Sequence, residues 1–178
     1  MIRDEAWADW IRSTVSRYET PLLLYAARLA GGSEAAQDVV QETFLRLCGQ
    51  DRAAVEERLN VWLFAVCRNY ALELRRKQSR LTELSKPMED TTSAPGSPVG
   101  ERLEKQEALQ QIMAALSRLP ENQQEVIRLK YEHGLSYREI SEVTKLTVTN
   151  VGFLMHAGLK RIRERAPGKT EGIGLEQQ

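Results

Sequence analysis

The chain has 178 residues with 25 basic and 25 acidic side chains, so a formal net charge of zero gives no global indication of a nucleic-acid partner. A hydrophobic content of 42% suffices for one ordinary core or two small ones. No segment approaches the roughly 20 apolar residues of a membrane span, and the N-terminus lacks the apolar run of a signal peptide. We therefore expect a cytoplasmic protein without membrane insertion.

Apolar residues spaced by three and four predict a first helix from Trp7 to Leu29, with Pro21 marking a kink or a boundary between two helices. Gly31 and Gly32 end this helix. Ser33 is predicted to cap a second helix, which runs from Glu34 to about Cys48. The core side of the second helix is expected to hold Ala36, Val40, Phe44 and Leu47.

The other side of this second helix is polar and acidic, with one leucine at the same helical spacing. Acids on an exposed helix face are ordinarily only solvated, and that simple interpretation is kept here as the alternative to a binding role. The face consists of Asp38, Gln41, Glu42 and Leu45.

A charged connection from Gly49 to Asn60, for which a turn of helix is an alternative, precedes a predicted helix, Val61 to Lys77. One face of that helix interleaves aromatic, amide and basic groups. Cations hold phosphates, a flat ring stacks on an unpaired base, and an amide bonds to a base edge. A half-buried tryptophan beside solubilising arginines is the equal alternative. The residues of this face are Trp62, Arg68, Asn69, Arg75 and Arg76, opposite a core stripe of Leu63, Val66, Cys67, Tyr70 and Leu74.

The character of the chain changes between Thr82 and Gly100, where three prolines, two glycines and several Ser and Thr residues predict a linker. Beyond it, Leu103, Leu109, Ile112, Met113, Leu116 and Leu119 predict another helix. Pro120 suits the first turn of the next helix, Glu121 to about His133. Its Val126, Ile127, Leu129 and Tyr131 are expected to contact the helices that follow.

Two short helices joined by a tight turn complete the second half. Ser136 and Glu139 form a capping box that opens a helix from Tyr137 to about Val143. After the turn, Thr147 is placed to cap a last helix with a basic end, which is the pattern of a helix-turn-helix. A plain helical hairpin is the alternative. The apolar stripe of the last helix is Val151, Leu154, Met155, Leu159 and Ile162.

The predicted fold class is therefore all-α, with two small helical domains joined by a flexible linker, the second being a four-helix domain with a helix-turn-helix. The expected boundaries are 1–80, 81–102 for the linker, 103–165, and 166–178 for a flexible tail.

Motifs of catalysis and metal binding are missing from the sequence. It contains no P-loop, GxGxxG, GxSxG or HExxH, and His133 and His156 have no evident nucleophile partner. Cys48 and Cys67 lack a CxxC pair or a histidine at ligand spacing, which indicates reduced thiols in apolar surroundings. We expect no enzyme activity, no cofactor and no metal.

Three ordered strings resemble parts of one known family. DVVQETFLRL at 38–47, VWLFAVCRNYALELRRK at 61–77 and LSRLPENQQEVIRLKYEHGLSYREISEV at 116–143 are similar to segments of bacterial RNA polymerase sigma factors of the extracytoplasmic function (ECF) group. The resemblance covers roughly 18–165. It implies a protein that binds core RNA polymerase and promoter DNA, directs transcription initiation, and is regulated by a separate anti-sigma factor.

The resemblance also implies roles for particular residues. Asp38, Gln41, Glu42 and Leu45 correspond to the surface that docks on the polymerase clamp. Trp62, Arg68, Asn69, Arg75 and Arg76 correspond to the surface along the melted minus-ten element. The loop at 51–60 would receive a flipped-out base, and the linker would thread into the polymerase.

Recognition of the minus-thirty-five element falls to the helix-turn-helix, where this chain departs from the family. The family's recognition helix typically carries several arginines, whereas residues 149–160 read TNVGFLMHAGLK. Asn150 is suited to adenine and Phe153 to a thymine methyl, and fewer cations imply fewer phosphate contacts. Alternatively, Phe153 belongs to the domain core or to a protein interface. The implied contact residues are Lys145, Thr149, Asn150, Phe153, His156, Lys160 and Arg161.

Two other functions fit parts of the sequence. A stand-alone helix-turn-helix regulator would bind duplex DNA without polymerase, but it does not explain the acidic face and the Trp62 helix before the linker. A sigma-mimicking interaction protein that sequesters a regulator would share the fold, yet it would not need Asn150, Lys160 and Arg161.

Overall fold

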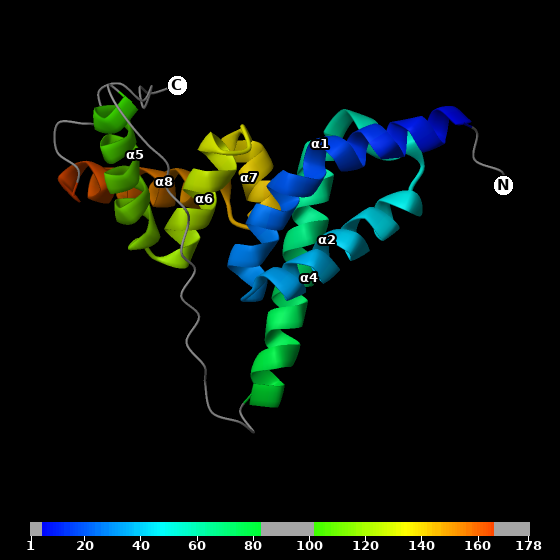
Figure 1. Cartoon of the computed structure of the whole chain (residues 1–178), viewed down its shortest axis with the longest axis horizontal. Coiled ribbons are helices and arrows are strands. Elements are labelled where there is room, and N and C mark those ends of the chain that lie inside the picture. Colours follow the sequence, from blue (N-terminus) through cyan, green and yellow to red (C-terminus); the bar gives the residue numbers. More distant parts are fainter. Residues whose placement is uncertain (1–4, 83–101, 166–178) are drawn as a thin grey trace. The chain divides into compact units, whose positions relative to one another are not determined.

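The computed structural model describes residues 5–82 and 102–165, and it contains helices and their connections but no strand in these ranges (Figure 1). The all-α prediction is confirmed. Most of the predicted linker, 83–101, and the predicted tail, 166–178, lie outside the described residues. The chain divides into two units; the first contains α1 to α4, and the second contains α5, α6, α8 and most of α7.

In the first unit, three long helices pack pairwise around one core. The helices are α1 (Glu5–Ala30), α2 (Ser33–Cys48) and α4 (Leu59–Thr82), with the short α3 (Arg52–Val55) and the 3₁₀ helix η1 (Glu56–Arg58) between the last two. Phe64 of α4 lies at the centre, and its ring meets that of Tyr25 of α1 edge-on with 5.3 Å between centroids. Leu22, Leu47 and Leu63 are also fully buried in the core of this unit.

The buried arc of α2 differs from the prediction. Ala36, Val40 and Leu47 are buried as expected, but Phe44 is only half-buried, while Val39 and Thr43 are buried. The reason is that α2 packs against both α1 and α4, so its covered arc is wider than one stripe. The Thr43 hydroxyl donates a 2.7 Å hydrogen bond to the Val39 carbonyl, which satisfies this polar group inside the core.

The core stripe of α4 is likewise rotated by a fraction of a turn. Leu63 and Cys67 are buried as predicted, whereas Val66, Tyr70 and Leu74 are half-buried. Contact with two neighbouring helices instead buries Val61, Phe64 and Ala71.

Two predicted helix boundaries in the first unit are wrong. Pro21 lies inside the single helix α1, so it marks no boundary between helices, and the alternative of a kink stays a prediction. Ser33 is the first residue of α2 rather than its cap; Gly32 occupies the cap position and its carbonyl accepts a bond from the Ala36 amide. Gly31 has a φ of 83°, a conformation that costs glycine little, and this allows the chain to reverse between the helices.

The second unit is built on the packing of α8 against α6 and α5. Its helices are α5 (Arg102–Ser117), α6 (Glu121–Tyr131), α7 (Tyr137–Thr144) and α8 (Val148–Arg165). Pro120 stands at the cap position of α6, one residue before the predicted first turn. Its core contains Ala115, Leu116, Leu119, Val126, Ile127, Leu129, Leu135, Ile140, Val151, Leu154, Met155 and Ile162.

Two residues that were predicted to contribute to the core of this unit are not buried. Tyr131 is exposed at the end of α6, and Leu159 is half-buried. Gly158 of α8 is buried instead. A Cβ atom added to this residue would lie 2.6 Å from Ile127 Cδ1 and 3.4 Å from Leu119 Cδ1. The absence of a side chain at Gly158 therefore allows α8 to approach α6 closely.

Local hydrogen bonds determine where α7 and α8 begin. The capping box is confirmed: the Ser136 amide donates to Glu139 Oε2 at 2.7 Å, and the Glu139 amide donates to Ser136 Oγ at 3.3 Å. In the turn, Lys145 has a left-handed φ of 63°, and the Ser141 hydroxyl donates to the Leu146 carbonyl at 2.6 Å. Thr147 Oγ1 accepts from the Asn150 amide, so Thr147 caps α8 as predicted.

Candidate protein and nucleic-acid interfaces

The predicted polymerase-binding residues share the face of α2 that is turned away from the core. Asp38, Gln41 and Leu45 are exposed, and the Leu45 side chain reaches 59% exposure. Glu42 is half-buried and accepts a 2.7 Å ion-pair hydrogen bond from Arg46. Asp38 forms no ion pair with any residue that the structure describes, so its charge is available to a partner.

Arg46 also connects this face to α4. Its guanidinium lies over the ring of Tyr70, 5.2 Å from the centroid, while its Nε donates to Glu42. Such a cation–π contact contributes about 0.5–1 kcal/mol at an exposed site. Glu42 therefore has a role within the fold besides any role in binding, and Asp38 is the cleaner position for a test of binding.

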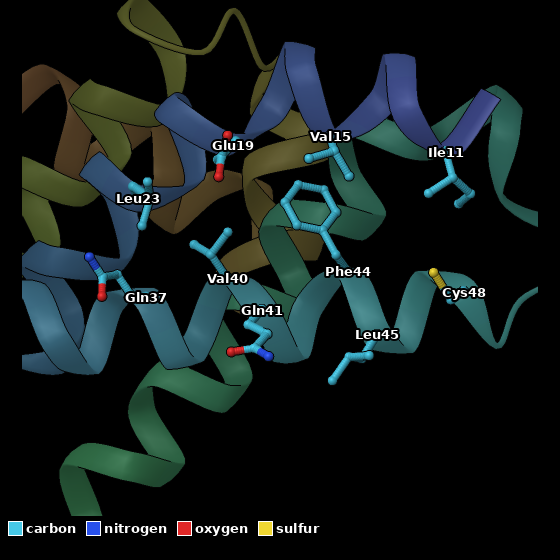
Figure 2. A pocket seen from close by; sticks show the side chains of 10 residues that line it. All are labelled: Ile11, Val15, Glu19, Leu23, Gln37, Val40, Gln41, Phe44, Leu45 and Cys48. Carbon is cyan, nitrogen blue, oxygen red and sulfur yellow. The ribbon is translucent and has the colours of Figure 1, made fainter. Parts of the chain in front are cut away.

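A groove of about 460 Å³ runs between α1 and α2 beside this face (Figure 2). Figure 2 shows the Phe44 ring projecting from α2 toward Val15 of α1. The half-burial of Phe44, which the sequence had placed in the core, arises because this groove leaves one side of the ring uncovered. The groove is lined by Ile11, Val15, Glu19 and Leu23 of α1 and by Gln37, Val40, Gln41, Phe44, Leu45 and Cys48 of α2.

The predicted minus-ten residues follow one side of α4. Asn69, Arg75 and Arg76 are exposed, whereas Trp62 and Arg68 are half-buried. The partial exposure of Trp62 fits both a packed ring and a stacking surface, so its role stays a prediction. From Trp62 to Arg76 the axial rise is about 21 Å, which gives an extended surface rather than a pocket.

Two further charged residues belong to this side of α4 and were not included in the prediction. Arg80 is exposed one turn beyond Arg76 and extends the basic surface. Glu73 lies four residues after Asn69, and it pairs with Lys77 at 2.8 Å. The same helical spacing that selected Arg76 points to Arg80, but the predicted helix ended at Lys77, five residues before the observed end.

The connection at 51–60, which the resemblance implied to be a loop, is helical from Arg52 onward, in line with the alternative of a helical turn. The Asp51 side chain caps α3 by accepting from the Ala53 amide, and Arg52 holds Glu56 with two hydrogen bonds of 2.9 and 2.6 Å. The hydrogen bond from Arg52 lowers the pKa of Glu56 below its usual value. The Arg52 guanidinium also lies 5.5 Å from the centroid of the Trp10 ring, so α1 and α3 are linked.

The predicted minus-thirty-five residues are all exposed, and all but one lie on α8. Lys145 is in the preceding turn. The Phe153 ring is 70% exposed, which excludes it from the domain core. These residues are Lys145, Thr149, Asn150, Phe153, His156, Lys160 and Arg161.

Among the residues that the structure describes, no group of three or more His, Cys, Asp or Glu side chains is arranged to hold a metal ion. The described helices are all too short or too polar to cross a bilayer.

Comparisons with known proteins identify both halves of the chain. The family model of Sigma-70 region 2 matches residues 14–81, and that of Sigma-70 region 4 matches residues 109–162. The ECF RNA polymerase sigma factor EcfG of Rhodopseudomonas palustris is 31% identical over 146 residues, which is 80% of this chain and 77% of that protein. The chain belongs to the ECF RNA polymerase sigma factors. Its function is thus that of a sigma factor in transcription initiation, and the predicted family is confirmed.

Other relatives agree with this assignment. The ECF sigma factor SigM of Bacillus subtilis is 28% identical over 133 residues, covering 72% of this chain and 77% of SigM. The sigma factor RpoE of Bartonella quintana, solved in complex with the anti-sigma factor NepR, shares the fold. That structure superposes with a TM-score of 0.64 at 22% identity and covers 86% of this chain and 94% of the compared chain.

Proposed function

We propose that this ECF sigma factor binds core RNA polymerase through the exposed face of α2 and directs initiation by reading two promoter elements. In this proposal α4 holds the melted minus-ten element and α8 reads the minus-thirty-five duplex. The observation that carries it is the order of these surfaces on one chain: an acidic face with an exposed leucine, then a tryptophan and arginine face, then a capped helix-turn-helix.

Docking on the polymerase is supported by the chemistry of the α2 face. Leu45 is 59% exposed, and covering the exposed part of this side chain contributes about 1–2 kcal/mol. Asp38 and Gln41 lie on the same side and provide a charge and an amide for specificity. The apolar groove between α1 and α2 continues this surface, so a helical partner has both an apolar contact and a polar rim.

Capture of the melted minus-ten strand is supported by the groups along α4. Taking a base out of the stack costs a few kcal/mol, and stacking on an aromatic ring returns about 1–3 kcal/mol per base. Trp62 supplies a partly exposed ring, Asn69 an exposed amide, and Arg76 an exposed cation for phosphate. Melting in this scheme uses binding energy alone.

Reading of the minus-thirty-five duplex is supported by α8, because an exposed helix that follows a capped short helix suits the major groove. Regulation by a separate anti-sigma factor is also part of the proposal. It is supported by the fold shared with RpoE of Bartonella quintana, which was solved with NepR.

Run-off transcription with core RNA polymerase tests the proposal. Promoter-specific transcripts are expected when the sigma factor is added to core enzyme, and none without it. DNA binding without initiation would instead identify a stand-alone regulator. If neither binding nor initiation were observed, the sigma-mimicking interaction protein would be favoured.

A charge reversal tests the docking face separately. Asp38→Lys is expected to weaken binding to core polymerase about tenfold, which corresponds to about 1.4 kcal/mol. Asp9→Lys makes the same change of charge at an exposed position of α1 that does not line the groove, and it should leave the affinity unchanged. Equal affinities of the two variants in a pull-down or titration would contradict docking through α2.

A further inference from the structure

The N-terminal part of α8 carries no positively charged side chain. Residues 148–159 contain no arginine or lysine, although α8 ends in several of them. Cations stand only at the two ends of this stretch, with Lys145 in the turn before it and Lys160 after it. The exposed side chains between these ends are Thr147, Val148, Thr149, Asn150, Phe153 and His156, and Thr147 caps the helix.

Helix dimensions indicate which of these groups reach bases. The first residues of a recognition helix contact base edges. From Thr149 to His156 the helix rises about 10 Å, which matches a major groove about 12 Å wide. Lys160 lies about 15 Å along the axis from Asn150, so it reaches the sugar-phosphate backbone at the edge of the groove. The charged groups therefore position the helix, and the uncharged groups face the bases.

Base chemistry then restricts what this helix can read. Guanine is most commonly recognised by the two donors of an arginine or by lysine, whereas asparagine pairs with the N6 and N7 atoms of adenine and apolar groups contact the thymine methyl. We propose that the minus-thirty-five element of this sigma factor is composed of A·T pairs, with Asn150 selecting an adenine and Phe153 a thymine. This inference rests on the proposed function of α8 in reading that element.

The exposure of Phe153 supports this assignment. Its ring is 70% exposed, the largest exposure of any large apolar residue on α8, where Val148 is 48% exposed while Val151, Leu154 and Met155 are buried in the core. Phe153 lies three residues after Asn150 and therefore on the same side of α8. An apolar ring beside the amide that reads adenine is placed for the methyl group of a neighbouring thymine.

Gly152 provides a position for a gain of specificity. It borders the outward side of α8, and an added Cβ would meet only Tyr137 Cε2, at an ordinary contact distance of 3.8 Å. An arginine there has room at its base and improves helix propensity over glycine. Gly152→Arg is therefore expected to introduce a guanine preference that the natural chain lacks.

Selection of promoters by reconstituted holoenzyme tests the inference. A library with a randomised upstream region and a fixed minus-ten element is bound and sequenced. The natural chain should enrich A·T pairs and no guanine at the positions read by α8. Asn150→Ala should lose the preference for one adenine, and Phe153→Ala that for one thymine, each by about tenfold. Gly152→Arg should add enrichment of a guanine.

Three outcomes would overturn the inference. Enrichment of guanine by the natural chain would refute the A·T composition while leaving the sigma function intact. Unchanged thymine enrichment with Phe153→Ala would show that Phe153 does not select a base, and it would indicate that this side chain contacts a protein instead. No enrichment upstream of the minus-ten element would refute both this inference and the proposed reading of the minus-thirty-five duplex.

Discussion

The guanidinium of Arg161 donates a 3.1 Å hydrogen bond from its Nη1 to Oε1 of Gln123, which is buried in α6. This bond joins the recognition helix α8 to the helix on which it packs. The family resemblance implied Arg161 as a contact to the minus-thirty-five element, and that role stays a prediction. The bond to Gln123 gives it a role in holding α8 in place, independent of any contact to phosphate.

Replacing Arg161 should therefore affect stability, while replacing its neighbour should not. Arg161→Ala is expected to lower the free energy of unfolding by about 1 kcal/mol, because Gln123 loses a charged donor. Lys160→Ala removes the same charge from an exposed position and should stay within about 0.5 kcal/mol of the natural chain. Urea unfolding of the full chain measures both values. Equal stabilities would mean that the bond to Gln123 contributes nothing.

The two glycines of α8 should respond in opposite ways to added side chains. Gly158→Val places methyl groups where Ile127 Cδ1 already lies 2.6 Å from the Cβ position, so overpacking should cost about 1–3 kcal/mol. Gly152→Ala meets only an ordinary contact and should gain up to about 1 kcal/mol from helix propensity. Thermal unfolding distinguishes them, and a neutral Gly158→Val would contradict the tight approach of α6 and α8.

The exposed leucine of α2 should matter for the polymerase and not for the fold. Leu45→Ala is expected to weaken core polymerase binding about tenfold with little change in the free energy of unfolding. Leu24→Ala is the matched control, because Leu24 is 52% exposed on α1 but does not line the groove. Fluorescence titration against core enzyme gives both affinities. A similar loss for Leu24→Ala would indicate a non-specific effect.

The buried thiol of Cys67 should lower the free energy of unfolding at alkaline pH. Burial raises the pKa of its thiol from 9.0 to about 12, although the adjacent Thr43 hydroxyl acts in the opposite direction. The thiol is protonated in both states below pH 9. Between pH 9 and 12 only the unfolded chain loses the proton, so the free energy of unfolding falls by about 1.4 kcal/mol per pH unit.

The comparison with Cys67→Ala isolates this contribution from other groups that titrate in the same range. The variant should be less stable at pH 8 because of the cavity, but its stability should fall less steeply above pH 9. Parallel pH dependence of the two proteins between pH 8 and 11 would show that Cys67 is not responsible.

Local signals in the sequence predicted the helix ends of the second half well. Ser136, Glu139 and Thr147 act through hydrogen bonds to amides three residues away, so the sequence contains both partners. Ser33 failed as a cap because Gly31 and Gly32 place the preceding turn differently, and this depends on how α1 and α2 meet. Pro21 failed as a boundary because packing of α1 keeps the helix continuous despite a missing amide.

The candidate surfaces were predictable where exposure follows from helical spacing, as for Asp38, Gln41 and Leu45. Spacing alone did not separate Val39 from Phe44, because the burial of each depends on a third helix or on a groove. The bond between Gln123 and Arg161 joins residues 38 positions apart, and nothing local in the sequence indicates it.

Pro21 affects the local unfolding of α1. Because proline has no amide hydrogen, the Arg17 carbonyl lacks its partner within the helix, and the backbone ladder is interrupted there. Of the buried residues of α1, only Thr14 precedes Pro21, whereas Leu22, Tyr25, Ala26 and Ala30 follow it. The segment before Pro21 should therefore unfold locally at a lower free energy than the segment after it.

The wall of the groove that α1 contributes spans this interruption, with Ile11 and Val15 before it and Leu23 after it. Amide hydrogens at 6–16 should accordingly exchange with deuterium faster than those at 23–30. A partner that binds in the groove should slow exchange most in the first segment. Deuterium uptake at 6–16 therefore measures binding without a fluorophore attached to the protein.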